Sequence, residues 1–115
     1  KNVRVLNTEK SMKLYKLAVY APVSHAEAVR NAIFRVDAGH IGNYSHCSFN
    51  VSGIGTFLPL EGTAPFIGER GKFEEVEEIR IETIVEEIKL KSTIQRMLEA
   101  HPYEEVSYDV YPLEN

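Results

Sequence analysis

The stretch Val76–Glu99, VEEIRIETIVEEIKLKSTIQRMLE, changes its hydrophobic period once and thereby decides the fold. From Val76 to Val85 the residues alternate in the manner typical of a β-strand. From Glu87 to Glu99 apolar residues recur every three or four positions, which predicts an amphipathic helix. Its buried stripe is expected to comprise Leu90, Ile94, Met97 and Leu98. His101-Pro102 should end this helix, because a residue that precedes proline disfavours helical geometry.

The same order of elements precedes this stretch. Leu14–Ala21 is rich in aromatic and aliphatic residues and ends at a proline, which predicts a strand. Ser24 and Glu27 have the spacing of a capping box, which would begin a helix. One apolar helix face follows, formed by Ala26, Val29, Ile33 and Val36. Gly39 is then suited to a left-handed helix end, and Tyr44–Val51 is predicted as the next strand.

The two halves of the chain align without a gap at an offset of 64 residues, so that strand falls on strand and helix on helix. With a last strand at Val106–Tyr111, the predicted order is βαββαβ. This order predicts an α+β, ferredoxin-like split βαβ fold, an antiparallel four-stranded sheet with two helices on one face. The first and third strands carry apolar residues on both faces, so we expect a loop or another subunit to cover the second face.

Length and composition limit the functions open to this protein. The chain has 115 residues, a net charge of −4 and a single cysteine, Cys47. This length allows one domain, which we assign to residues 13–115; residues 1–12 are expected to be a non-native remnant or a loose arm. The scattered basic residues lack the footprint of a nucleic-acid-binding protein, and no apolar stretch reaches the roughly 20 residues needed to cross a bilayer. We therefore expect a cytoplasmic protein without a nucleic-acid or membrane partner.

Residues 52–72, SGIGTFLPLEGTAPFIGERGK, form a connection much longer than the about 4–6 residues usual in compact domains. Apolar side chains lie among its glycines, and a disordered linker would lack them. We therefore expect a structured loop that packs on its own sheet or on a neighbouring subunit. Glycine-rich backbone of this kind can also form an anion-binding nest. The candidate ligand contacts in this loop are Gly53, Gly55, Thr56, Phe57, Glu61, Gly62, Phe66 and Gly68.

The sequence HPYEE at residues 101–105 brings a histidine, a tyrosine and two carboxylates together after the second helix. Imidazole and carboxylate groups suit Zn²⁺, so His46, His101 and Glu104 are candidate ligands of a divalent metal. No HxxxH or HExxH pattern supports this site. A helix end followed by a solvated acidic turn is the alternative interpretation.

Several motifs resemble one known family when they are taken in order. They are HCSF at residues 46–49, GTF at 55–57, PFIG at 65–68, VEEIRIE at 76–82, HPYEE at 101–105 and YDVYPL at 108–113. Together they resemble the YqfO-like domain, which is inserted in bacterial members of the NGG-one-interacting factor three family and also occurs as a stand-alone protein. The resemblance covers residues 13–113.

This resemblance implies a ferredoxin-like fold similar to that of the PII signalling proteins and the CutA proteins, which are commonly trimers. In PII proteins the loop that corresponds to residues 52–72 contacts partners and nucleotides. The two-metal site of the parent family lies in flanking domains. The resemblance therefore implies neither metal ligands nor hydrolase activity for this chain.

Two functions follow as hypotheses. The long loop and the doubly apolar strands favour an oligomeric binding or regulatory module without enzymatic activity, with a trimer favoured over a dimer. Its contacts with a small-molecule ligand, a metal or a protein partner would be made through residues 52–72. The alternative is a metal-dependent enzyme that uses His46, His101 and Glu104 at or near a subunit interface, with help from Tyr103 or Tyr44.

Overall fold

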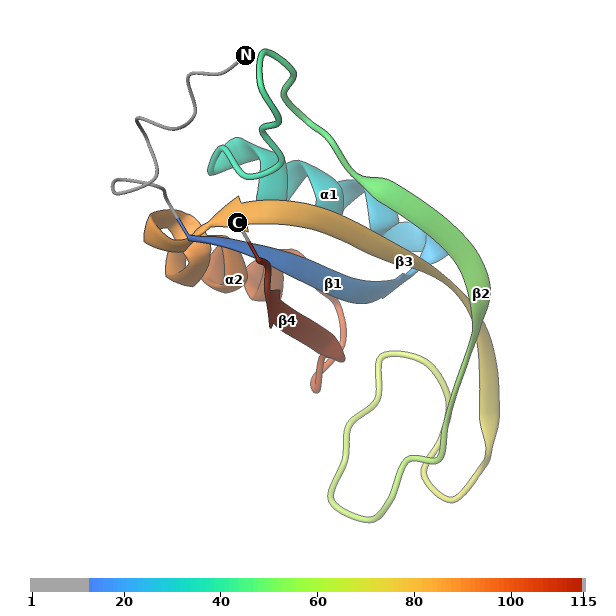
Figure 1. The fold of residues 1–115 in the computed structure, drawn as a ribbon. Helices are drawn as coiled ribbons and strands as arrows, with labels where there is room; N and C mark the ends of the chain where they lie inside the picture. The colour runs from blue at the N-terminus through green and yellow to red at the C-terminus, as the bar shows by residue number, and fades with distance from the viewer. Residues whose placement is uncertain (1–12, 115) are drawn as a thin grey trace.

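The computed structural model describes residues 13–114; residues 1–12, predicted to be a remnant or a loose arm, lie outside the described residues. The predicted βαββαβ order is confirmed (Figure 1). The elements are β1 (Leu14–Pro22), a short 3-10 turn (Val23–His25), α1 (Ala26–Arg35), β2 (Phe49–Phe57), β3 (Glu74–Glu86), α2 (Glu87–Ala100) and β4 (Tyr108–Pro112).

The four strands form one antiparallel sheet in the order β2-β3-β1-β4. β3 is the longest strand, and it pairs with β1 through Glu78–Glu86 and with β2 through Glu74–Glu82. The first residues of β3 therefore extend past the end of β1 and have β2 as their only strand neighbour. Figure 1 shows this end of the β2–β3 pair leaving the body of the sheet and leading into the loop of residues 58–73.

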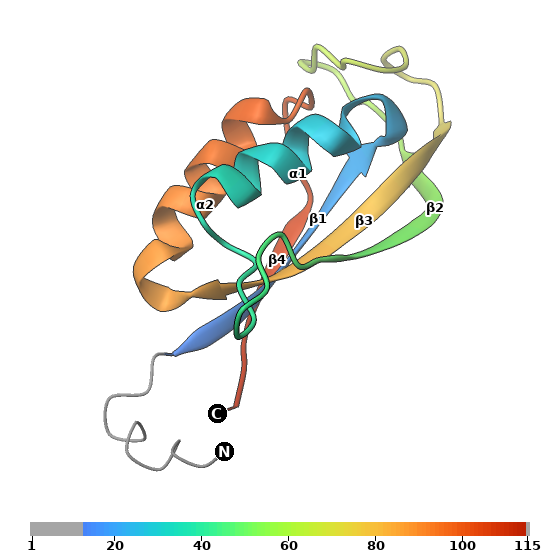
Figure 2. The same cartoon turned by 90° about the horizontal axis from the view of Figure 1, so that it is seen from above.

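Both helices lie side by side on one face of the sheet (Figure 2), as the predicted fold class requires. Because side chains alternate along a strand, the odd-numbered residues of β1 and β3 point toward the helices. Each large apolar side chain buried there contributes about 1.5–3 kcal/mol of transfer free energy. The core is formed by Leu17, Val19, Ala21, Val29, Ile33, Ile81, Val85 and Met97, all of them buried.

The opposite face of the sheet, called the open face below, is charged at its centre. The carboxylate of Glu82 lies 3.8 Å from Nζ of Lys16 and 2.8 Å from Nη2 of Arg80. Apolar side chains lie on this face as well: Ile84 of β3 pairs with Lys16, Tyr20 of β1 pairs with Arg80, and Phe49 at the β2 edge is 67% exposed. The expectation of apolar residues on both faces of the first and third strands is therefore confirmed.

The second strand differs from its prediction at Tyr44–Val51. β2 begins at Phe49 and continues to Phe57, so the first six residues of the predicted loop belong to a strand. The glycines of this segment leave no alternating pattern of side chains from which a strand can be predicted. The segment is a strand because its backbone pairs with β3. The prediction that His46 lies on a strand is wrong, because His46 has a φ of 59° and precedes β2.

The internal offset of 64 residues is correct for only part of each half. It places β1 on β3 and α1 on α2. It places β4, however, on residues 44–48, which precede β2. The two halves therefore resemble each other in their strand–helix units and differ in how the chain returns to the sheet.

α1 begins and ends differently from its prediction. Ser24 and Glu27 form no capping box, because the Ser24 hydroxyl lies 2.9 Å from Nδ1 of His25 and a 3-10 turn precedes the helix. After the helix, Asp37 has a φ of 71° and Gly39 a φ of 83°, so the left-handed conformation predicted for Gly39 is present, but α1 ends earlier, at Arg35. Aspartate is one of the few residues besides glycine that tolerate this geometry.

The C-terminal half follows its prediction more closely. β3 and α2 lie within two residues of their expected bounds, and α2 ends at the residue before His101. In the buried stripe of α2, Met97 is confirmed, Leu98 is 39% exposed, and the buried Thr93 was not expected. The Thr93 hydroxyl donates a 2.7 Å hydrogen bond to the Lys89 carbonyl, which makes its burial tolerable.

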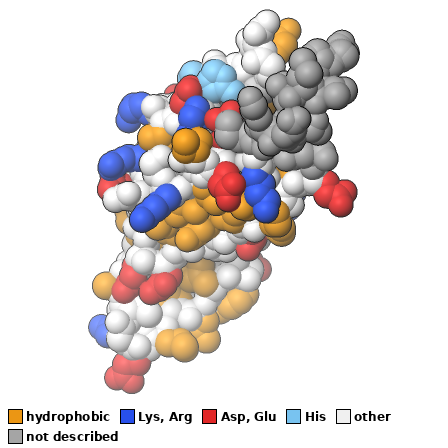
Figure 3. All heavy atoms as spheres, turned by 60° about the vertical axis from the view of Figure 1, so that its left-hand side comes forward, with side chains coloured by type: hydrophobic (Ala, Val, Ile, Leu, Met, Phe, Trp, Pro, Cys, Tyr) orange, Lys and Arg blue, Asp and Glu red, His pale blue; other side chains and the backbone are white. Residues whose placement is uncertain are grey.

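The loop of residues 58–73 carries exposed apolar side chains. Leu60 is 66% exposed and Phe73 is 63% exposed. Figure 3 shows hydrophobic and acidic side chains together on the lower part of the molecule, which this loop and the adjoining ends of β2 and β3 form. None of the helices in the described residues combines the length and apolar character that a membrane crossing requires.

Gly39 anchors the connection between α1 and β2 to the sheet. Its N–H donates to the Ile84 carbonyl at 2.9 Å, and its own carbonyl accepts from the Cys47 N–H at 2.8 Å. The Thr83 hydroxyl then donates to the Cys47 carbonyl at 2.7 Å. A Cβ on Gly39 would stand 3.0 Å from atoms of Cys47, Thr83 and Phe34, and the φ of this residue is +83°. Glycine is therefore required both by conformation and by space.

We predict that Gly39→Ala destabilises the fold by about 2–4 kcal/mol, because it combines a left-handed backbone with crowding against the Cys47 carbonyl and the Phe34 and Thr83 side chains. Gly42→Ala is the matched control, since Gly42 has a φ of +59° and nothing within 4 Å of an added Cβ. This control should lose only about 1–2 kcal/mol. Urea denaturation followed by circular dichroism measures both, and equal losses would refute the role given to crowding.

Candidate functional site

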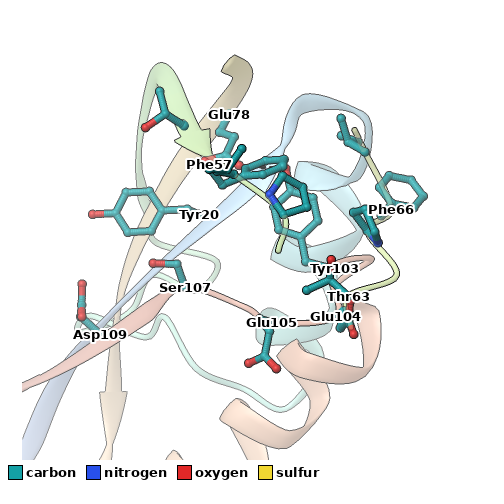
Figure 4. A pocket seen from close by; sticks show the side chains of 16 residues that line it. Tyr20, Phe57, Thr63, Phe66, Glu78, Tyr103, Glu104, Glu105, Ser107 and Asp109 are labelled. Atoms are coloured by element: carbon teal, nitrogen blue, oxygen red, sulfur yellow. Dashed lines mark hydrogen bonds between the residues drawn. The ribbon is translucent and has the colours of Figure 1, made fainter. Parts of the chain in front are cut away.

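A pocket of about 460 Å³ lies between the loop of residues 58–73 and the segment that follows α2 (Figure 4). The ends of β1, β2 and β3 form its floor, and the loop forms one wall. The overhang of the β2–β3 pair makes this pocket, because the loop folds back across the gap that the shorter β1 leaves. The side chains that shape it include Tyr20, Phe57, Phe66, Glu78, Tyr103 and Glu104.

Tyr103 lies between two phenylalanine rings that come from different segments (Figure 4). Its ring centroid is 6.2 Å from that of Phe57 in β2 and 6.4 Å from that of Phe66 in the loop. These distances fall in the range of favourable edge-to-face and tilted aromatic pairs. Phe66 also packs edge-on against His25, at 5.3 Å between centroids. The rings thus join the loop to the body of the domain and supply an apolar wall.

The Tyr103 hydroxyl is fixed by a carboxylate. It donates a 2.8 Å hydrogen bond to Oε2 of Glu78. Burial of the phenol raises the pKa of Tyr103 well above its usual value of 10.0, and the hydrogen bond to Glu78 and the negative charge of Glu78 raise it further. Tyr103 therefore remains a neutral hydrogen-bond donor at any physiological pH.

Glu78 reaches Tyr103 across the backbone of Gly55. A Cβ on Gly55 would collide with the Glu78 carboxylate, so only glycine leaves this path open. Gly53 and Gly55 lie in the extended backbone of β2, paired with Glu78 and Val76. An anion-binding nest needs successive N–H groups that converge, which a strand does not provide. The nest suggested for these glycines is therefore wrong.

The loop of residues 58–73 is held at its middle and at its base. Oε1 of Glu104 accepts a 2.9 Å hydrogen bond from the Ala64 N–H, which ties the middle of the loop to the segment after α2. The Pro59 carbonyl accepts a 2.7 Å hydrogen bond from the Gly71 N–H, which closes the base. The prediction of a structured loop that packs on its own chain is confirmed, although the loop begins later than expected.

His101 positions the segment that carries Tyr103. It is 7% exposed, with Nε2 at 2.7 Å from the Tyr20 carbonyl oxygen and Nδ1 at 3.2 Å from the Tyr103 amide nitrogen. Because the carbonyl accepts and the amide donates, the proton is assigned to Nε2. Burial lowers the pKa of His101 below its usual value of 6.5 and outweighs the opposing effects of the Tyr20 hydrogen bond and the Glu78 charge. The imidazole is therefore neutral at neutral pH.

Only some of the eight residues predicted to contact a ligand line the pocket. Half of them line the pocket: Gly55, Thr56, Phe57 and Phe66. Gly53 lines an adjoining hollow of about 270 Å³ on the open face of the sheet. Glu61, Gly62 and Gly68 are exposed on the loop and line neither.

The three candidate metal ligands are not brought together within one copy of the chain. Glu104 lines the pocket, His101 has both ring nitrogens engaged, and His46 packs on Phe34 at 4.8 Å between ring centroids. The described residues contain no group of three His, Cys, Asp or Glu side chains arranged to hold an ion. A metal shared across a subunit interface would require His101 to give up one of its two hydrogen bonds.

Sequence reasoning missed three pocket residues that come from three strands. Tyr20, Glu78 and Asp109 line the pocket from β1, β3 and β4. Each stands on the open face, where alternation alone predicts a solvated polar side chain. They share one cavity only because the strands are neighbours in the sheet and the loop of residues 58–73 folds back over them.

Solved structures of low sequence identity share this fold. CutA from Archaeoglobus fulgidus, a periplasmic divalent cation tolerance protein, superimposes with a TM-score of 0.64 at 14% identity, over 89% of this chain and 85% of that chain. GlnK from B. subtilis gives a TM-score of 0.60 at 11% identity, over 89% and 86%. At such identities the likeness shows the fold alone. The chain is thus an α+β domain with the ferredoxin-like fold of the CutA and PII proteins.

Sequence relatives define the domain more closely, although none of the protein-family models compared with the chain matches it. A GTP cyclohydrolase 1 type 2 homologue from Halalkalibacterium halodurans is 52% identical over 115 residues. A Bacillus cereus protein related to NIF3 superimposes with a TM-score of 0.78 at 52% identity, over 90% of this chain and 26% of that chain. The chain is homologous to these proteins and is an insertion-type domain of the NIF3-related, YqfO-like family. It spans 31% of the length of the H. halodurans relative.

We predict that the stability of the fold decreases as the pH falls below about 6.5. The pKa of His101 is lower in the folded chain than in the unfolded chain, so the unfolded chain binds more protons in this range. The stabilisation is complete above the unfolded pKa and is lost as the pH falls through the folded pKa. Urea denaturation at pH 7.5, 6.0 and 5.0 measures this loss.

His101→Gln is expected to be less stable at pH 7.5 and to lose less stability on acidification than the wild-type chain. His46→Gln, which changes an exposed histidine, is the matched control and should retain the wild-type pH dependence. If His101→Gln retained the full wild-type pH dependence, the assignment to His101 would be incorrect.

Proposed function

We propose that this domain is a binding module that holds a small-molecule ligand between the loop of residues 58–73 and Tyr103, and that it works as a homo-oligomer. The observation that carries the proposal is the pocket itself. Its volume of about 460 Å³ falls within the range of roughly 300–1,000 Å³ typical of small-molecule sites. Its walls combine aromatic rings with a few polar groups, which is the usual composition of such sites.

Binding is favoured over catalysis by the state of the titratable groups. A general acid or base works best with a pKa near the working pH and with its proton within reach of the substrate. The Tyr103 proton is held by Glu78, and the pKa of Tyr103 is raised far from neutrality. His101 uses both ring nitrogens to hold the backbone. These groups shape the pocket rather than supply a reactive proton.

A ligand in this pocket would also act on the loop. The loop supplies Phe66 to the wall and is tied through Ala64 to Glu104. A bound molecule that contacts Phe66 and Tyr103 therefore stabilises the loop in its closed position. The exposed Leu60 and Phe73 lie on the same loop, so its position sets the apolar surface offered to a partner. This coupling is the basis of the regulatory role that we propose.

The binding proposal is tested by a fragment screen that follows the amide NMR signals of the whole chain. We expect fragments to shift the amide signals of Ala64, Phe66 and Tyr103, and Phe66→Ala to weaken their binding about tenfold because one aromatic wall is lost. Phe73→Ala is the matched control, since Phe73 lies on the same loop and does not line the pocket. The proposal fails if neutral, cationic and anionic fragments all leave these signals unchanged, or if the two variants behave alike.

The proposed homo-oligomer, with a trimer favoured, is supported by the β2 edge of the sheet. β2 pairs only with β3, so its other edge is unpaired among the described strands. Phe49 and Ile54 of β2 are 67% and 61% exposed. Exposed apolar edge strands readily pair with further chains unless they are covered. A second copy of the chain would cover these residues.

Sedimentation equilibrium tests the assembly, and we expect about three times the 13.0 kDa mass of one chain. Phe49→Glu combined with Ile54→Lys should dissociate it, because both changes place charge in an apolar interface. Ile88→Lys is the control, since Ile88 is 80% exposed on α2, away from β2. A wild-type chain that stays monomeric at millimolar concentration would refute the proposed assembly while leaving the pocket proposal standing.

A further inference from the structure

The charged side chains that line the pocket are all acidic. They are the carboxylates of Glu78, Glu104, Glu105 and Asp109. No lysine, arginine or histidine is among the described residues that line it. None of the four carboxylates forms an ion pair with a described residue; Arg80, which neighbours Glu78 along the open face, pairs with Glu82 instead. The pocket therefore presents negative charge that the described part of the chain does not neutralise.

The aromatic wall adds a second, independent attraction for positive charge. The face of an aromatic ring carries negative potential and attracts a cation that lies within about 6 Å of the ring centroid. Tyr103, Phe57 and Phe66 stand close enough together for one bound group to contact more than one ring. Tyr103 is the strongest of the three in this respect, because the hydrogen bond that its hydroxyl donates to Glu78 increases the electron density of the phenol.

The arrangement of the carboxylates favours an organic cation over a metal ion. A divalent metal needs several ligand atoms within about 2.0–2.6 Å of one point. The described residues offer no group of three acidic, histidine or cysteine side chains gathered in this way. An organic cation spreads its charge over a larger volume, so it can contact separated carboxylates and rings at the same time.

The same features disfavour a phosphate-bearing ligand. Phosphates are commonly held by arginine, lysine or converging backbone N–H groups. The carboxylates would repel such a group, and the glycines beside the pocket in β2 are in extended backbone. GlnK, which shares the fold at 11% identity, has been solved in complex with ATP.

We infer that the pocket binds an organic cation, a protonated or quaternary amine whose charged group lies against Tyr103 and Phe66 and faces Glu78 and Glu104. This inference rests on the proposed binding function and assigns the chemical class of its ligand. Glu78 accepts the hydrogen bond of the Tyr103 hydroxyl and presents its charge from β3, and Glu104 lies where the loop meets the segment after α2.

The test compares two probes of the same shape that differ in charge. Choline carries a quaternary ammonium, and 3,3-dimethyl-1-butanol replaces its nitrogen by carbon. Titration of each probe into the whole chain, followed through the amide signals of Ala64, Phe66 and Tyr103, gives the two dissociation constants. We expect choline to bind at least about tenfold more tightly than the neutral probe, because both the rings and the carboxylates act on its charge.

Two conservative variants connect this preference to the pocket. Glu78→Gln and Glu104→Gln keep an acceptor for the Tyr103 hydroxyl and the Ala64 N–H but remove the charge. Each should reduce the ratio of choline affinity to neutral-probe affinity about threefold or more. Glu77→Gln is the control, since Glu77 is exposed, neighbours Glu78 in β3 and does not line the pocket.

The outcomes separate this inference from the proposed function. Equal binding of the two probes at these amides, or tighter binding of ATP there, refutes the cationic ligand and leaves a binding pocket of another class. Displacement of choline by Mg²⁺ or Zn²⁺ alone at micromolar concentration refutes the organic cation in favour of a metal. If neither probe nor any fragment of the screen shifts these signals, both the ligand class and the binding function fail.

Discussion

The two hydrogen bonds of the His101 imidazole are the interaction on which the pocket depends. One nitrogen holds the carbonyl of Tyr20 at the end of β1, and the other holds the amide of Tyr103 in the segment after α2. This pair of bonds sets where Tyr103 stands relative to the sheet. The position of the Tyr103 ring then determines where the Glu78 carboxylate, Phe57 and the loop residue Phe66 come to rest. A neutral, buried histidine thus acts as a structural crosslink between segments 81 residues apart.

A mismatch in strand length supplies the space that these contacts enclose. β3 has 13 residues, whereas β1 has 9, so the β2–β3 pair overhangs the sheet and the long loop folds back over the gap. Gly55 leaves room for the Glu78 side chain across the overhang. The loop that looked like an interruption between two halves is therefore one wall of a cavity. All of the lining residues fall within the segment shared with the H. halodurans relative, so the cavity belongs to the inserted domain itself.

The acidic and aromatic character of the pocket, on which the inferred ligand class rests, is not specified by the fold. CutA and GlnK share the fold with this chain at 14% and 11% identity, and such a likeness carries no information on side chains. The turn HPYEE at residues 101–105 supplies much of this character. It provides the histidine that fixes the turn, the tyrosine that forms the wall, and two of the four carboxylates.

Hydrophobic period determined most of the element order and the fold class, because burial on one face imposes spacings of two on strands and of three to four on helices. It also marked the core residues Val29, Ile33 and Met97. β3 and α2 were therefore placed within two residues, whereas β2 was misplaced, since its glycines carry no period and its partner strand fixes it. The sequence also marked Phe57, Phe66 and Glu104 as candidates. Only the tertiary structure could show that both ring nitrogens of His101 contact backbone groups, and that Tyr20, Glu78 and Asp109 share a cavity with the marked residues. The reason is that such contacts depend on the order of the strands and on the path of the loop that folds back over the sheet. Neither produces a local pattern in the sequence.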